Sequence, residues 1–350
     1  MTFQTKIKIG TLFLFGLFAC AFFVPKGEMQ TKVETAGQRF KNIKVLNDLP
    51  ADQLGEVMNI FAASLGGDCK KCHVSNDKDF EKDDNRSKNT ARAMIHMVFD
   101  INKNNFKGQT QVSCNTCHNG RENPRSVPSL EAPVPAPERP KQPEVKPTID
   151  QILANYAAAV KGKGKMVSSR LIQATRLEGN GKSEPETIEQ SQGKIRVKVI
   201  YPETPVTATY DGTKVTTVTK TGEIQIQADQ AEQIKREAML FANPDLKSVY
   251  AKLDYRFLDR LNDREVYLVL GTTADNQRDR LFFDKETGLL VRRVSVTATM
   301  LGAFPFQYDY SDYKDYGGSV KLPATVAFAM PNQRWTRKIV KVQNNAKIEI

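Results

Sequence analysis

Two short motifs hold most of the residues in this chain that can do chemistry. The first reads Cys69-Lys70-Lys71-Cys72-His73 and the second reads Cys114-Asn115-Thr116-Cys117-His118. The chain has five cysteines and three histidines, so the motifs take four of the cysteines and two of the histidines. Such a concentration of thiol and imidazole groups predicts the same chemical role for both motifs.

The pattern Cys-x-x-Cys-His is the signature of covalent c-type haem attachment. Two thiols on one helical turn can add to the two vinyl groups of one haem, and the adjacent histidine then faces the iron as its proximal ligand. We therefore predict two covalently bound haem c groups. Their thioether anchors are Cys69, Cys72, Cys114 and Cys117, and their proximal ligands are His73 and His118.

Two other kinds of cysteine site compete with this interpretation. A four-cysteine zinc site would use the same thiols, but it leaves both histidines without a role. A thioredoxin-like redox pair needs one Cys-x-x-Cys on a strand–helix unit, whereas this chain has two on a segment that we expect to be helical. Haem attachment is the interpretation that uses every residue of both motifs.

The sixth iron ligand decides between electron transfer and catalysis. A filled sixth position confines a haem to electron transfer, whereas an empty one permits small-molecule chemistry, as in a di-haem peroxidase. His96 is the one histidine outside the motifs, so the chain cannot form two bis-histidine haems. The methionines near the motifs are Met58, Met94 and Met97, and we predict Met58 and Met94 as the sixth ligands of an electron carrier.

Two helices are expected to position these methionines. Apolar residues recur at helical spacing over residues 51–65, and Gly66-Gly67 ends that helix so that it can fold back over the first haem. A second helix is expected over residues 87–104, with an apolar stripe through Met94, Ile95 and Val98. His96 points nearly opposite to Met94, among charged residues, and is expected on the surface.

Residues 1–30 are a targeting segment, with lysines at 6 and 8, an apolar run over 11–24 and a proline at 25. The run is short for a membrane-spanning helix and fits a signal peptide. Three outcomes stay open: cleavage at Ala19-Cys20-Ala21, lipidation of Cys20 in an imperfect lipobox, or an uncleaved anchor. Each implies an exported, periplasmic chain, and the last two attach it to a membrane.

The rest of the chain divides by composition into three parts. Residues 31–123 hold both motifs, residues 124–148 contain eight prolines, and residues 149–350 lack cysteine and histidine. Proline at this density favours an extended linker, which would leave a freed fragment of residues 31–130 with unchanged redox potentials. We predict an all-α di-haem cytochrome domain, a linker and an α+β domain with a curved antiparallel sheet, a half-barrel.

The sheet is expected from alternating apolar segments after residue 194, which follow a helix over 149–160 and are interrupted by a helix over 229–242. The expected strands are 195–201, 214–220, 223–228, 266–271, 280–284, 289–298, 306–313, 325–329 and 334–342. The sequence Asp284-Lys285-Glu286-Thr287-Gly288 is typical of a hairpin turn.

The overall charge is +11, and 40% of the residues are hydrophobic. This composition is ordinary for a soluble protein with a buried core. The positive charge suits an acidic redox partner or anionic lipid, or serves solubility alone. Since no run of basic residues is interleaved with aromatic ones, we expect no nucleic-acid partner.

Residues 41–120 resemble the cytochrome subunit of photosynthetic reaction centres. The matching stretches are 41–46 (KNIKVL), Asp48-Leu49, Met58 to Leu65-Gly66 with the first motif, 91–94 (ARAM) with Met97, Asp100-Ile101-Asn102, and 112–120 (VSCNTCHNG). The resemblance implies that Met58 and Met94 are the sixth ligands. It also implies a lipoprotein, lipidated at Cys20, that passes electrons to an oxidised chlorophyll pair in a membrane reaction centre.

The chain departs from that family in two respects. It has two attachment motifs where the photosynthetic subunit usually has four, and it lacks a histidine after the second helix, where the family supplies a ligand to another haem. The electron donor and acceptor are therefore redox proteins of either a reaction centre or another membrane oxidoreductase.

Residues 149–350 resemble the carrier domains of lipoprotein-sorting proteins. The similar stretches are 148–153 (TIDQIL), 283–290 (FDKETGLL), and 310–313 (YSDY) with Leu322-Pro323. The resemblance implies a concave sheet face that holds a lipid or quinone-like molecule, or docks a protein. A lipid- or protein-binding module with accessory haems is therefore a third candidate function.

Overall fold

The computed structural model describes residues 33–67, 69–73, 80–128, 130, 138–224, 226, 228–240 and 244–350. The predicted targeting segment and Cys20 lie outside these residues, as do residues 131–137 of the proline-rich stretch. In the part of the chain that the structure describes, no helix is long and apolar enough to cross a membrane.

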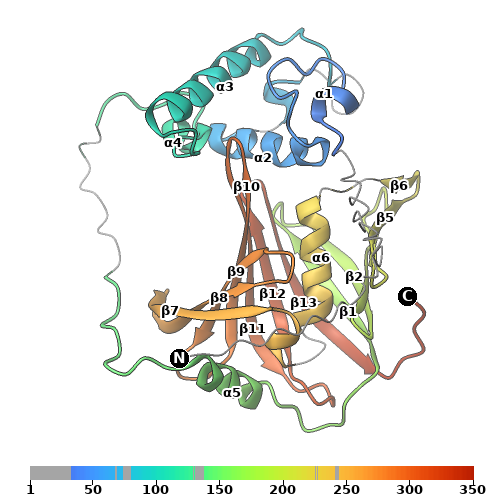
Figure 1. The fold of residues 1–350 in the computed structure, drawn as a ribbon. Helices are drawn as coiled ribbons and strands as arrows, with labels where there is room; N and C mark the ends of the chain where they lie inside the picture. The colour runs from blue at the N-terminus through green and yellow to red at the C-terminus, as the bar shows by residue number, and fades with distance from the viewer. Residues whose placement is uncertain are drawn as a thin grey trace, which may run out of the picture. The chain divides into compact units, whose positions relative to one another are not determined.

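Helices dominate the described residues between 34 and 123 (Figure 1). The helices are α1 (Ala36–Arg39), the 3-10 helix η1 (Ala51–Gln53), α2 (Leu54–Leu65), the 3-10 helix η2 (Cys69–Lys71), α3 (Arg86–Asn105) and α4 (Cys114–His118). The helices expected over 51–65 and 87–104 are present, the first beginning with a 3-10 turn.

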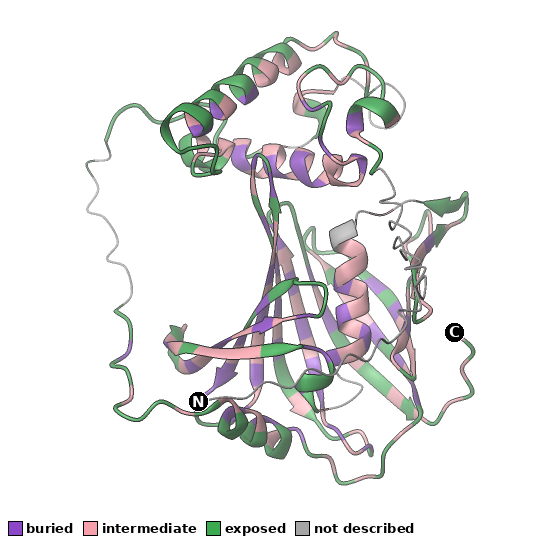
Figure 2. Ribbon diagram, viewed as in Figure 1, coloured by how far each residue is buried: buried purple, intermediate pink, exposed green. Residues whose placement is uncertain are grey.

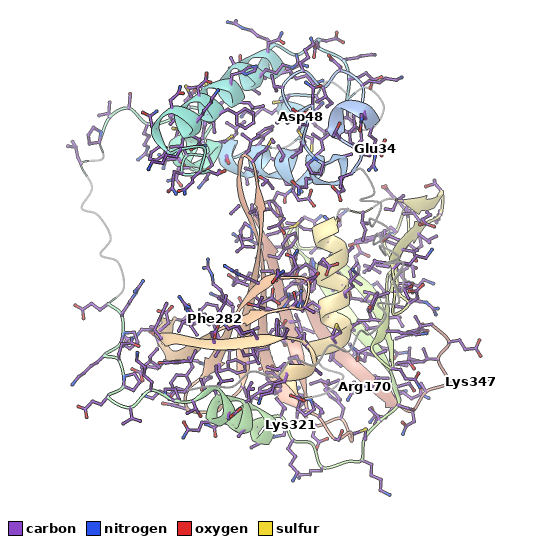
Figure 3. All side chains as sticks on the ribbon, in the orientation of Figure 1. Glu34, Asp48, Arg170, Phe282, Lys321 and Lys347 are labelled. Atoms are coloured by element: carbon purple, nitrogen blue, oxygen red, sulfur yellow. The ribbon has the colours of Figure 1, made fainter. Side chains whose placement is uncertain are left out.

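A small apolar core joins these helices. Its buried residues are Ala36, Leu46, Leu49, Val57, Ile95, Val98 and Leu301. The chain before α2 folds against α1, because Ala36 N–H donates to the Leu49 carbonyl at 2.6 Å and Thr35 forms a β-bridge with Pro50. Glu34 and Asp48 accordingly lie beside α1 in Figure 3.

The described strands of residues 149–350 form one 13-stranded antiparallel sheet in the order β6-β5-β4-β3-β2-β1-β13-β12-β11-β10-β9-β8-β7. Two meanders, β1 to β6 and β7 to β13, meet where the first strand pairs with the last. The strands are β1 (Ser169–Glu178), β2 (Ser183–Ser191), β3 (Lys194–Val199), β4 (Val206–Tyr210), β5 (Val215–Thr219), β6 (Gly222–Ile224), β7 (Lys252–Leu261), β8 (Arg264–Thr272), β9 (Arg278–Asp284), β10 (Leu290–Thr299), β11 (Gly302–Lys314), β12 (Leu322–Met330) and β13 (Gln333–Asn344).

The remaining helices are α5 (Ile149–Ala159), α6 (Ala228–Leu240) and the 3-10 helix η3 (Leu246–Ser248). Alternation along the strands buries one face of the sheet, as in β12, where Leu322, Val326 and Phe328 are buried. Helix α6 packs against β3, β4 and β5, and buried residues run along both the helix and the strands (Figure 2).

The large antiparallel sheet with a few helices confirms part of the expected fold. Strands β1, β2, β4 and β7 were not expected from the sequence. The strand expected over 223–228 is the short β6, and α6 already begins at Ala228. A separate all-α domain remains a prediction, because residues 34–350 group into one compact unit.

The described end of the proline-rich stretch is attached to the sheet. The side-chain amide of Gln142 donates to the Leu258 carbonyl at 2.7 Å and accepts from the Leu258 N–H at 2.8 Å. The Arg139 guanidinium lies over the Phe257 ring, 5.3 Å from its centre. These contacts cover part of β7, which is an edge strand of the sheet.

Candidate functional site

The second motif is a complete short helix, α4. Ser113 begins it as the N-cap, and the Ser113 N–H donates to the Thr116 hydroxyl at 3.0 Å. Nδ1 of His118 lies 3.0 Å from the Arg121 carbonyl, so it carries the proton and Nε2 is left for a metal. A histidine that ligates a metal usually donates its other ring nitrogen in this way.

The first motif is a tighter turn. Cys69–Lys71 form the 3-10 helix η2, and the His73 N–H donates to the Cys69 carbonyl at 3.0 Å. The His73 ring meets the edge of the Phe80 ring at 4.9 Å, and its Nδ1 is buried without a hydrogen-bond partner. Burial lowers the pKa of His73, which favours the neutral imidazole that a metal requires.

The electrostatics of the cysteines disfavour a thioredoxin-like redox pair. Burial raises the pKa of the Cys72 and Cys114 thiols, whereas a reactive thiol in a redox pair has a lowered pKa. No disulfide joins the four motif cysteines. Among the described residues, no group of three or more His, Cys, Asp or Glu side chains lies together in a way that could hold a metal ion.

The two motifs meet at the C-terminal end of α2. Gly66 ends that helix with a φ of +62°, and a Cβ at this position would lie 2.1 Å from the Gly120 carbonyl oxygen. The Gly120 N–H donates to the Ser64 carbonyl at 2.9 Å. The Lys71 ammonium in the first motif pairs with Glu122 at 2.8 Å. The C-terminal end of α2 thus connects both motifs, through contacts between residues that are distant in the sequence.

Helix α3 is connected to the first motif through Asn85. This residue is the N-cap of α3, where its side chain accepts from the Ser87 N–H at 2.9 Å. Its amide also donates to the Lys71 carbonyl at 2.9 Å. An asparagine just before a helix is a recognisable N-cap signal, but its second partner could not be read from the sequence.

The three candidate methionines lie in different environments. Met58 is half-buried and packs against the small apolar core. Met94 is 39% exposed and Met97 is 42% exposed. The expectation that Met94 lies on the buried stripe of α3 is wrong, because Ile95, Val98 and Asn102 form that stripe and Met94 flanks it. His96 is exposed, as expected.

These residues fit a c-type haem on chemical grounds. The thiols of α4 share one helical turn, and Nε2 of His118 is left free by the hydrogen bond on the other ring nitrogen. Burial favours the neutral His73 ring, the form that binds a metal. The exposed Met94 side chain provides a soft thioether donor beside the buried stripe of α3. Which methionine binds which iron stays a prediction.

The sheet contains a buried polar cluster around Asp279. Its carboxylate accepts from the Tyr250 and Ser295 hydroxyls, both at 2.6 Å. The fully buried Arg293 lies 3.6 Å from it and donates to Gln233 at 2.7 Å. The Arg293 guanidinium lies over the Tyr308 ring and donates to the Tyr310 hydroxyl at 3.3 Å, and these two tyrosine rings stack on each other.

A small cavity lies beside this cluster. It is lined by residues that include Ile172, Tyr308, Val326 and Arg337, and its volume is about 40 Å³. That volume accommodates a few waters at most, whereas pockets for drug-sized ligands are about 300–1,000 Å³. The cavity therefore offers no room for an acyl chain or a quinone in this conformation.

Comparison with solved structures gives low similarity scores. A domain of a putative outer membrane lipoprotein-sorting protein from Vibrio parahaemolyticus has 10% identity and a TM-score of 0.40, over 57% of this chain and 92% of that one. A LolA superfamily protein from Nitrosomonas europaea has 9% identity and a TM-score of 0.41, over 58% and 96%. At these scores, a carrier-like role for the sheet remains a prediction.

No curated protein sequence matches the chain. Residues 20–159 match the sequence family described as photosynthetic reaction centre cytochrome C subunit. This stretch contains both Cys-x-x-Cys-His motifs, helices α1 to α4 and the three candidate methionines. The N-terminal part of the chain is therefore similar to a reaction-centre cytochrome, and the similarity implies binding of c-type haem.

Proposed function

We propose that the chain is an exported electron-transfer protein with two covalently attached haem c groups. Cys69 and Cys72 would anchor the first group with His73 as proximal ligand. Cys114, Cys117 and His118 would do the same for the second. Met58 and Met94 would supply the sixth ligands, and a haem with both axial positions filled exchanges electrons without binding a substrate at the iron.

The geometry of the second motif carries this proposal. The His118 ring is fixed by its hydrogen bond to the Arg121 carbonyl, 3.0 Å away, and Nε2 is the ring nitrogen left to bind iron. The hydrogen bond from the Gly120 N–H to the Ser64 carbonyl holds the second motif at the C-terminal end of α2, the helix that the first motif follows. Two haems held on neighbouring segments suit electron exchange within one chain.

Haem stoichiometry tests the proposal. The purified chain should contain two haems by the pyridine haemochrome assay, and both should stay attached in a denaturing gel. Replacing Cys114 and Cys117 together with Ala should leave only the haem of the first motif attached, and replacing all four motif cysteines with Ala should leave none. One haem in the wild-type chain, or bound zinc in its place, would contradict the proposal.

A di-haem peroxidase-like enzyme is the alternative that shares these attachment sites. It needs one iron with an open sixth position. The ferric absorption spectrum distinguishes the two functions, because two low-spin haems with methionine–iron charge-transfer bands indicate an electron carrier. A high-spin haem together with peroxide turnover would show an enzyme.

We also propose that the N-terminal segment attaches the chain to a membrane through lipidation of Cys20, which would place the haems near a membrane redox partner. Cys20→Ala should then move the protein from the membrane fraction to the soluble periplasmic fraction. A single acyl chain binds a membrane only marginally, so stable attachment requires more than one. A wild-type protein found soluble after cleavage behind Ala21 would contradict this part.

A further inference from the structure

The turn between β10 and β11 places a leucine in the core of the helices. Leu301 is fully buried, although a hairpin turn normally lies at the surface. It belongs to the same apolar cluster as Val57 of α2 and as Ile95 and Val98 of α3. A sheet residue thus contributes to the core that supports both candidate methionine helices.

The next residue of the turn lies against the start of the second motif. Gly302 has a φ of +141°, and a Cβ built there would lie 3.3 Å from Cβ of Ser113, the N-cap of α4. The Thr299 hydroxyl donates to the Gly302 carbonyl at 2.8 Å and accepts from the Leu301 N–H at 3.3 Å. The turn therefore has a defined shape where it meets the residue before Cys114.

A second turn of the sheet reaches the other methionine helix. Asn332, between β12 and β13, donates its side-chain amide to the Asn59 side chain at 2.7 Å. Asn59 directly follows Met58 on α2, and the next residue, Ile60, is buried within the apolar cluster of the sheet. Two hairpin turns thus contact the two segments that carry proposed haem ligands.

We propose that Leu301 and the β10–β11 turn are positioning elements for the haem-bearing helices. This inference rests on the proposed function. The apolar surroundings of a haem control the access of water and the local dielectric, and both set the reduction potential. By filling the core between α2 and α3, Leu301 keeps water from that side of the haem sites. The sheet then tunes the potentials without providing an iron ligand.

The test compares Leu301→Ala with Leu281→Ala in the full-length haem protein. Leu281 is also fully buried, but it lies in the core of the sheet. Both substitutions remove the same atoms. Leu301→Ala should lower at least one midpoint potential, because water stabilises the more highly charged oxidised haem, and Leu301→Met should restore it. Leu281→Ala should reduce stability and leave both potentials unchanged.

Equal potentials in wild type and Leu301→Ala, or equal shifts in the Leu301 and Leu281 variants, would overturn the inference.

Failure of the proposed function can be separated from failure of this inference. If the chain carries no haem, the potentials do not exist and the proposed function is wrong. Hydrogen exchange of the haem-free chain then tests the packing itself. Leu301→Ala should speed exchange in α2 and α3 more than Leu281→Ala does, and equal exchange in the two variants would overturn the inference.

Discussion

The helical core of residues 34–123 and the core of the sheet differ in how complete they are. The helical core consists of a few buried side chains, and apolar residues around it stay exposed, among them Phe80, Met94, Met97 and Phe106. The sheet buries one large cluster of aliphatic and aromatic residues on β1 to β3, β8 to β13, α5 and α6. It also buries ion pairs, among them Arg337 with Glu186 and Arg293 with Asp279.

This difference indicates where each region obtains its stability. We expect the sheet to be stable without a cofactor, because its core buries many large apolar side chains. The helical region is small, and small domains commonly need a covalent link or a metal to reach the same stability. The two proposed haems would supply such a link, and the cofactor would then be part of the fold as well as of the function.

Loss of haem attachment should have the largest effect and should separate the two regions. When all four motif cysteines are replaced with Ala, amides of α2 and α3 should exchange more than about a thousandfold faster, equivalent to about 4 kcal/mol of lost protection. Amides of β8 to β12 should keep their wild-type rates. Hydrogen-exchange mass spectrometry measures both. Asn115→Ala, at an exposed position of the second motif, is the control. Unchanged exchange in α2 and α3 of the cysteine variant would show that the helical region does not depend on haem.

Breaking the buried ion cluster should destabilise the sheet alone. Arg293→Met leaves Asp279 with fewer positive partners and should cost about 3 kcal/mol, as is usual when one member of a buried ion pair is removed. Arg292→Ala, in the neighbouring and more exposed pair with Asp309, should cost at most about 1 kcal/mol. Urea unfolding measures both values. A large loss of haem absorbance in Arg293→Met at low urea would show that the helical region and the sheet unfold together.

The methionine of α3 gives a smaller, local effect. Met94→Ala should abolish one methionine–iron charge-transfer band and lower the potential of one haem, because methionine ligation raises it relative to histidine. His96 and Met97 are both exposed on the same helix, so His96→Ala and Met97→Ala are the controls and should leave the ferric spectrum unchanged. A silent Met94→Ala combined with an altered His96→Ala spectrum would assign the ligand to His96.

The smallest effect concerns the ion cluster at the start of α3. Hydrogen bonds from Arg92 and Lys44 hold the pKa of Asp83 well below its usual range. The ionised Asp83 carboxylate therefore stabilises the folded state fully above its unfolded-state pKa of about 3.9. This stabilisation is lost as the pH falls from that value through the lower pKa of the folded state. Thermal unfolding should show wild type more stable than Asp83→Asn at pH 7, with the difference vanishing at low pH. The neighbouring Asp84→Asn is the control, and a difference that persists at low pH would contradict this origin.

Local patterns in the sequence predicted the residues that act within one segment. The two motifs, the helices around Val57 and Val98, and most strands of the second meander follow from spacing and alternation. What could not be predicted depends on contacts between distant residues. Leu301 reads as an ordinary turn residue, because nothing in its neighbourhood in the chain shows that it is buried among helices.

Strand β2 illustrates the same limit in the sheet. Its inward positions are Glu184, Glu186 and Ile188, so the segment reads as a polar loop. Glu186 is buried because it accepts two hydrogen bonds from Arg337, which lies 151 residues away on β13. Met94 shows the reverse error, since its apolar character suggested burial, but the helix turns about 100° per residue and places it on the flank.

The pairing of the first strand with the last one determines when the sheet can form. Arg170 on β1 lies opposite Asn344 on β13, so the central seam needs residues that are synthesised long after β1. Contacts this remote in sequence slow folding. Both cysteine motifs are synthesised long before the seam, so their thiols stay accessible while the sheet is still open. A chain truncated after Met330 would lose β13 and split the sheet through its middle rather than at an edge.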